Sequence, residues 1–169
     1  MKTAVKLYSL NYSNVKTYLF AILFVAGNII LPQICHFVPN GGATLLPIYF
    51  FTLIATYKYG FRVGLLTALL SPIINYLLFS MPTAAMLPVI LVKSGLLAIA
   101  ASVAAHYSKK ISLSALVLAV LAYQLIGSLA EWAILGNLQI AISNFRMAIP
   151  GMLIQMFGGY ALLKAIAKI

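Results

Sequence analysis

The chain has 169 residues, of which 64% are hydrophobic and 7% are charged. A soluble domain carries about 25% charged residues, so this composition excludes an ordinary soluble fold and favours helices that cross a bilayer. The net charge of +10 does not predict nucleic-acid binding, because the lysines and arginines are scattered between apolar runs instead of forming a patch. The single Cys35 excludes an intrachain disulfide and a cysteine-based metal site.

Six apolar runs follow one another along the chain. A helix needs about 20 residues to cross the ~30 Å hydrocarbon core, and helices are the economical form where no water can satisfy the backbone. We therefore expect an all-α membrane protein consisting of one integral membrane domain, residues 1–169. Its six predicted transmembrane helices cover residues 17–37, 44–57, 61–79, 84–107, 111–134 and 145–169.

The distribution of cations predicts the orientation of these six helices. In a six-span arrangement, nine of the eleven cations fall on one side of the membrane. By the positive-inside rule that side is the cytoplasm, so both termini are expected there. The predicted location is a bacterial cytoplasmic membrane, crossed several times. The nine residues are Lys2, Lys6, Lys16, Lys58, Arg62, Lys109, Lys110, Lys164 and Lys168.

Small and polar residues within the spans predict contacts between helices. Asn28 lies inside the first predicted span, where a polar side chain usually bonds a neighbouring helix. Gly60 and Gly64 are spaced by four at the start of the third span, which lets helices approach closely. Two interpretations of this spacing stay open: packing within the bundle, or a docking face for another membrane protein.

Three charged residues remain once the nine cations are set aside: Lys93, Glu131 and Arg146. All three are predicted in the half of the last three spans that faces away from the cytoplasm. Charges at depth are costly and usually face each other or an aqueous cavity. One interpretation is an ion pair, Lys93–Glu131 or Arg146–Glu131, that only holds the bundle together. The other is a cavity that attracts an anion, because two cations against one carboxylate leave one positive charge over.

Enzyme activity is not expected. Glu131 is the only acidic residue, which excludes a carboxylate dyad, an aspartate-rich site for diphosphate-bound magnesium and an intramembrane aspartyl protease. His36 and His106 are expected on opposite faces and cannot share a metal ion. No phosphate-binding glycine loop is present, so the chain is not expected to hydrolyse ATP. The sequence thus predicts no catalytic residue, no metal site and no cofactor.

Several short motifs resemble a known family, the substrate-binding S components of energy-coupling factor (ECF) vitamin transporters. These are also proteins with six spans in under 200 residues and cytoplasmic termini. The resemblance covers about two thirds of the chain and rests on hydrophobic motifs around turns and prolines. The motifs are Pro47, Lys58-Tyr59-Gly60-Phe61-Arg62-Val63-Gly64-Leu65, Ser71-Pro72, Met81-Pro82-Thr83-Ala84 and Pro150-Gly151-Met152-Leu153-Ile154-Gln155.

The resemblance implies a substrate pocket on the outer side, formed by the first outer loop and the last three spans. The residues of this chain at those places are Asn40, Lys93, Glu131, Trp132 and Arg146. Members often have a glutamate near the position of Lys93, so the ligand here is expected to carry a different charge.

The resemblance also implies partners, namely a membrane coupling subunit and two cytoplasmic ATPases. Members tend to carry an Ala-x-x-x-Ala docking motif in the first span, where this chain has Ala21 and Val25. We therefore expect docking at Ala21, Val25, Gly60 and Gly64.

Two functions from different classes follow. The first is a binding subunit that captures a small, water-soluble, anionic vitamin or precursor. The alternative is a small six-span scaffold of the cell-shape type, which binds no ligand. A scaffold needs no charges at depth, whereas Lys93 and Glu131 are predicted there.

Overall fold

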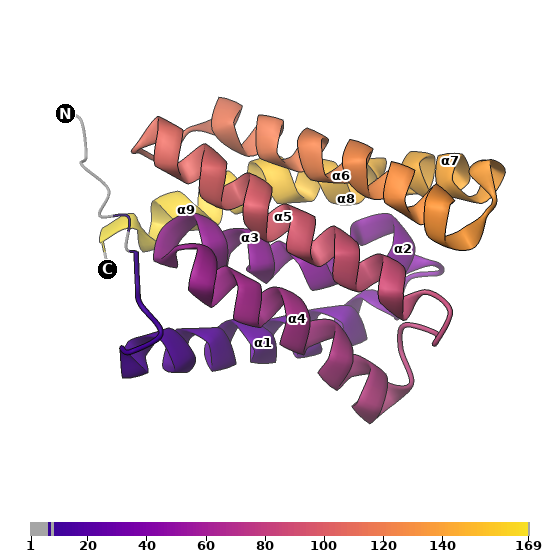
Figure 1. The fold of residues 1–169 in the computed structure, drawn as a ribbon, viewed down its shortest axis with the longest axis horizontal. Coiled ribbons are helices and arrows are strands. Elements are labelled where there is room, and N and C mark those ends of the chain that lie inside the picture. The colour runs from indigo at the N-terminus through magenta and orange to yellow at the C-terminus, as the bar shows by residue number, and fades with distance from the viewer. Residues whose placement is uncertain (1–6, 8, 169) are drawn as a thin grey trace.

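The computed structural model describes residue 7 and residues 9–168, and within that part the chain is helical and forms no strand (Figure 1). The helices are α1 (Val15–Cys35), α2 (Gly41–Leu45), α3 (Pro47–Tyr59), α4 (Phe61–Phe79), α5 (Leu87–Ser108), α6 (Leu113–Leu135), α7 (Leu138–Met147), α8 (Ile149–Leu153) and α9 (Gly159–Ala165). A π-helical turn, η1 (Ile154–Gly158), joins α8 to α9, and a 3-10 turn, η2 (Ile166–Lys168), follows α9.

Four of these helices, α1, α4, α5 and α6, are long and apolar enough to cross a membrane. The bent pair formed by α7 and the helix from Ile149 to Ala165 makes a fifth if it is counted as one span. This confirms the coarse class that was predicted, an all-helical protein with several helices long and apolar enough to span a membrane. The number of long spans differs from the predicted six, because the second and last predicted segments take other forms.

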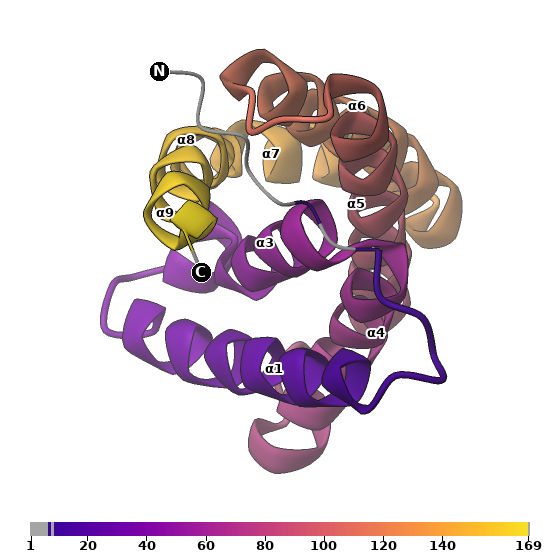
Figure 2. The same ribbon diagram turned by 90° about the vertical axis from the view of Figure 1, so that its left-hand side faces the viewer.

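The second predicted segment, residues 44–57, is a short central helix. Leu46 has a left-handed backbone with φ 50°, which ends α2 and starts α3 one residue later. The 13 residues of α3 are about 20 Å long, less than the thickness of the hydrocarbon core. Every residue from Thr52 to Tyr59 is buried, and α3 contacts α1, α4, α5 and α9. Figure 2 shows α3 enclosed by these helices, so it forms the core of the bundle.

The last predicted segment, residues 145–169, begins earlier than expected. Asn137 caps α7, its Oδ1 accepting a hydrogen bond from the Ile140 amide at 3.1 Å. The chain then bends by 49° between Met147 and Ile149. Pro150 in the first turn of α8 has no amide hydrogen to donate, so the α7 ladder cannot continue through it. The predicted loop is therefore mostly helix, and the predicted end, Ile169, lies outside the described residues.

Contacts between distant segments gather the cationic loops at one end of the bundle (Figure 1, left). The Leu10 amide donates to the Tyr59 carbonyl, and the Tyr57 hydroxyl donates to the Lys110 carbonyl at 2.8 Å. Lys58 Nζ donates to the carbonyl of Ile166. We call this end the cation-rich end; it carries Lys58, Arg62, Lys109, Lys110 and Lys164. The predicted contributions of Lys2 and Lys6 lie outside the described residues.

The predicted role of Asn28 is confirmed by a network that joins three helices. Asn28 Nδ2 donates to Thr52 Oγ1 at 3.0 Å and to Ser71 Oγ at 3.1 Å. Asn75 Nδ2 donates to the carbonyls of Asn28 and Ser71, at 3.0 and 2.9 Å. We call these four residues the Asn28 cluster. It ties α1 to α3 and α4 in the interior, where polar groups need partners.

The residues expected to dock a partner lie mostly inside the bundle. Ala21 and Val25 are buried. At Gly64 an added Cβ would lie 1.8 Å from Thr56 Oγ1, so this glycine allows α4 to approach α3. Gly60 has φ 97° and forms the turn between these two helices. The internal-packing interpretation therefore describes Ala21, Val25 and Gly64, whose faces the bundle already covers.

Candidate functional site

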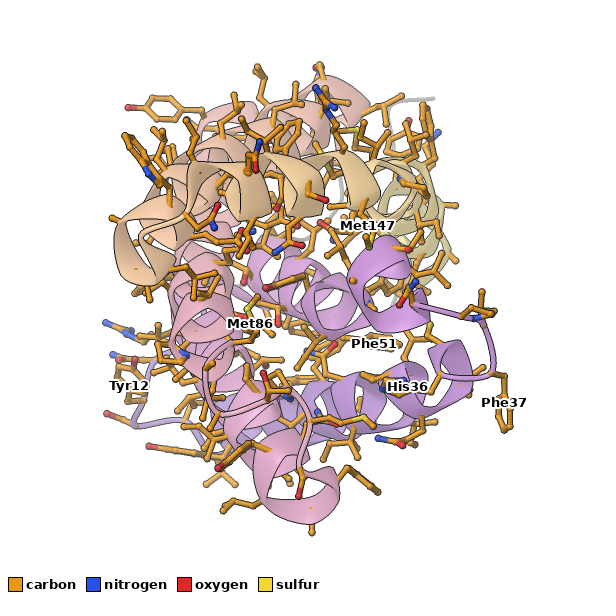
Figure 3. All side chains as sticks on the ribbon, turned by 90° about the vertical axis from the view of Figure 1, so that its right-hand side faces the viewer. Tyr12, His36, Phe37, Phe51, Met86 and Met147 are labelled. Carbon is orange, nitrogen blue, oxygen red and sulfur yellow. The ribbon has the colours of Figure 1, made fainter. Side chains whose placement is uncertain are left out.

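A cavity of about 410 Å³ lies at the end of the bundle opposite the cation-rich end. Pockets for small ligands usually measure about 300–1,000 Å³, so this one has the size of a ligand site. Figure 3 shows this end, with His36 and Met86, two of the lining residues, and with Phe37 pointing away from the body of the molecule. The lining comes from the end of α1, the segment from α2 to α3, α4, the α4–α5 loop, α5, α6 and α7.

A buried ion pair forms the polar centre of the lining. Lys93 Nζ, on α5, lies 2.6 Å from Glu131 Oε2, on α6. Lys93 is 6% exposed and Glu131 is 1% exposed. Asn144, on α7, donates its Nδ2 to the other carboxylate oxygen at 2.6 Å. Both carboxylate oxygens of Glu131 therefore have hydrogen-bond partners, and one of these partners, Asn144, comes from the short helix α7.

Local sequence explains how α6 accommodates this pair. Gln124, Gly127 and Glu131 are spaced by three and four residues, so they lie on one face of the helix. A Cβ at Gly127 would lie 2.7 Å from Lys93 Cγ. The glycine leaves room for the aliphatic part of the lysine, which crosses α6 on its way to Glu131.

The structure brings together two of the five predicted site residues. Lys93 and Glu131 both line the cavity. Arg146 is exposed on α7 and Trp132 is 45% exposed on α6, and neither lines the cavity. Asn40 is exposed, has a left-handed backbone with φ 55° and precedes α2, also outside the lining.

The placement of Arg146 changes the charge balance on which the anionic ligand was predicted. That prediction counted Lys93 and Arg146 together against Glu131. In the structure the cavity lining contains Lys93 and Glu131 but not Arg146, so its two charges cancel. The excess of positive charge among the three deep residues is therefore not found at the cavity.

Sequence reasoning missed the amides of the site: Gln33, Asn75, Gln124 and Asn144 all line the cavity. Gln124 is 1% exposed, and neither its Oε1 nor its Nε2 has a hydrogen-bond partner. Asn75 Oδ1 and Gln33 Nε2 are also buried without a partner. Buried polar atoms are usually paired, so such atoms beside a cavity point to a ligand or to water. A polar face eight residues long on an apolar helix, from Gln124 to Glu131, was the available signal.

Among the described residues no group of three or more His, Cys, Asp or Glu is placed to hold a metal ion. The chemistry that the lining offers is hydrogen bonding by amides around a neutralised ion pair. Comparison with known proteins adds no identity: the chain matches no family model, and no curated protein or solved structure is significantly similar to it.

Proposed function

We propose that this protein is the substrate-binding subunit of a membrane importer of the energy-coupling factor type and captures a small water-soluble molecule from outside the cell. The observation that carries the proposal is the cavity of about 410 Å³, whose buried polar atoms lack partners within the chain. A protein that only packs against others gains nothing from such atoms, since each unpaired buried group costs about 1–3 kcal/mol.

The position of the cavity supports the direction of capture. It lies opposite the cation-rich end, which by the positive-inside rule faces the cytoplasm. We propose both termini on that side and a polypeptide that crosses the membrane six times, with α3 as a short crossing and α7 to α9 as a bent one.

Cysteines at Thr83 and Asn137 should then be labelled from outside intact cells by a membrane-impermeant reagent. A cysteine at Lys109 should not, and labelling there would contradict the orientation.

The proposed partners are a membrane coupling subunit and two cytoplasmic ATPases, since the chain has no nucleotide-binding motif of its own. A face for the coupling subunit has to lie outside the buried positions Ala21, Val25 and Gly64. The exposed apolar side of α1, which includes Leu19, Ile22 and Leu23, contacts lipid or such a partner.

The test is binding and uptake measured separately. The purified chain in lipid nanodiscs should retain a soluble small molecule from cell extract, whereas energised uptake should require co-expression of the coupling subunit and both ATPases. Uptake by the chain alone would contradict the subunit assignment. If nothing is retained, and the chain instead co-purifies with cell-shape proteins, the scaffold function replaces this one.

A further inference from the structure

We infer that the cavity selects an uncharged molecule that presents an amide-type edge, with a hydrogen-bond donor beside an acceptor, to Gln124. This inference rests on the proposed function and narrows it to a substrate class: neutral cyclic amides, imides and related nitrogen heterocycles. It replaces the anionic class expected from the sequence.

The charged groups of the lining leave no charge for a ligand to neutralise. Glu131 accepts from Lys93 at 2.6 Å and from Asn144 at 2.6 Å, so the carboxylate is fully engaged and the lysine charge is matched. An anionic ligand would add a buried negative charge with no lysine or arginine of the lining free to pair with it, which is costly away from water. The remaining basic side chain of the lining, His36, is exposed. Arg146 is exposed outside the lining and is not placed to compensate.

Gln124 lines the cavity and carries both halves of an amide. Its carbonyl oxygen accepts and its nitrogen donates, and neither atom has a partner in the chain although the residue is 1% exposed. A carboxylate ligand could satisfy the nitrogen only and would leave the oxygen unpaired. An amide or imide edge satisfies both atoms at once, in the two-bond arrangement by which glutamine and asparagine recognise heterocycles.

Asn75 provides a second hydrogen-bonding group, and its contacts within the chain determine that the unpaired atom is an acceptor. Its Nδ2 already donates to the carbonyls of Asn28 and Ser71, which uses both hydrogens of the amide nitrogen. The atom left unpaired is therefore the acceptor Oδ1, in a residue that is 2% exposed and lines the cavity. An acceptor at this position is satisfied by a donor from the ligand, which a carboxylate group lacks at neutral pH.

The walls around these amides are apolar and partly aromatic. Leu46, Tyr49, Val89 and Ile90 line the cavity, and Tyr49 packs against Tyr123 with ring centroids 5.7 Å apart. Apolar walls with a few convergent polar groups are typical of sites for small organic ligands. A flat ring buries its faces against these side chains and directs its polar edge to the amides.

The test compares probes that differ only in the relevant edge. Nicotinamide and nicotinate share a ring but carry an amide and a carboxylate, and uracil is a small cyclic imide. Binding of each to the full chain in lipid nanodiscs is measured by the rise in unfolding temperature and by titration. We expect nicotinamide and uracil to bind at least about tenfold more tightly than nicotinate, which is the effect of one lost hydrogen bond that leaves a buried group unpaired.

Gln124→Met is the deciding variant, because it keeps the side-chain length and removes both amide atoms. It should weaken nicotinamide and uracil at least about tenfold. Without a probe its unfolding temperature should equal or exceed that of the wild type, because two unpaired polar atoms are gone. Gln139→Met, at an exposed position on α7, is the matched control and should leave both properties unchanged.

Each outcome decides the inference. Equal or tighter binding of nicotinate overturns the neutral class, as does the absence of binding by all three probes. Unchanged binding in Gln124→Met overturns the role of Gln124. The proposed function is judged separately by retention of a small molecule from cell extract: an anion retained there contradicts this inference alone, whereas nothing retained contradicts binding altogether.

Discussion

Two groups of buried polar residues in this bundle differ in how far the chain itself satisfies their hydrogen bonds. In the Asn28 cluster every side-chain polar atom except Asn75 Oδ1 has a partner, whereas at Gln124 neither amide atom has one. In the Asn28 cluster, Asn28 donates to Thr52 and Ser71 and is held in turn by Asn75. Around the cavity, the Lys93–Glu131–Asn144 contacts are made but both polar atoms of Gln124 remain open. Closed networks hold helices together, while open polar atoms beside a cavity await a partner from outside the chain.

Asn75 shows that the two groups are connected. Its nitrogen donates to two carbonyls of the Asn28 cluster, its oxygen has no partner within the chain, and the residue lines the cavity. The cluster thereby sets which atom of this amide a ligand meets. The contacts that stabilise α1, α3 and α4 therefore also determine which atom of Asn75 is left without a partner.

The largest expected effect comes from breaking the buried ion pair. Glu131→Leu leaves Lys93 buried without its carboxylate, and removal of one partner of such a pair costs about 3–5 kcal/mol of unfolding free energy. The double variant Lys93→Met/Glu131→Leu should recover most of this loss, because it removes both charges. Denaturant unfolding in nanodiscs measures both. A double variant as unstable as Glu131→Leu would show that the carboxylate stabilises the bundle without regard to Lys93.

A smaller loss is expected when the closed cluster is opened. Asn28→Leu removes two donated hydrogen bonds and leaves Ser71 without this partner. We expect a loss of about 2 kcal/mol, given the cost of unpaired buried groups and the modest net worth of such bonds between membrane helices. The less stable variant should still bind nicotinamide, because Asn75 can still donate to the backbone carbonyls of residues 28 and 71. A stable variant that no longer binds would make Asn28 part of the site.

Two glycine substitutions test whether Lys93 needs the space that Gly127 leaves for its side chain. Gly127→Ala places a Cβ about 2.7 Å from Lys93 Cγ, so the lysine must shift, at a cost of about 1.5 kcal/mol for overpacking. Gly95→Ala is the control, because no atom lies within 4 Å of the added Cβ and the helix gains about 0.4–1 kcal/mol. Thermal unfolding of the two variants should therefore shift in opposite directions. Equal shifts of the unfolding temperature in the two variants would mean that Lys93 does not need the space beside Gly127.

The smallest expected effect separates two buried serines. Ser71 accepts from Asn28, whereas Ser94 is buried with no partner for its hydroxyl. Ser71→Ala should lower the unfolding free energy by about 1 kcal/mol, and Ser94→Ala should leave it unchanged or raise it. Denaturant unfolding of the two variants measures the difference between their unfolding free energies. A loss at Ser94 equal to that at Ser71 would show that Ser94 has an interaction absent from this structure.

Much of the architecture followed from the sequence because it depends on composition and on local signals. Apolar length predicted the long helices α1, α4, α5 and α6, and the polar Asn28 predicted an interhelical contact. Two segments departed from expectation. A left-handed residue at Leu46 and the bend before Pro150 set their limits, and neither changes the average hydropathy of its run.

The site itself was decided by tertiary structure. Lys93 and Glu131 are recognisable from the sequence as charges within apolar helices, where an unpaired charge is costly and needs a partner. The sequence did not determine that Lys93, and not Arg146, meets Glu131, nor that Gln124 and Asn75 line the same cavity. The physical reason is that helix faces toward lipid are as apolar as faces toward the core, so polarity does not reveal how each helix is rotated. Only packing sets that rotation, and the fold-back of α7 then brings Asn144 to the carboxylate.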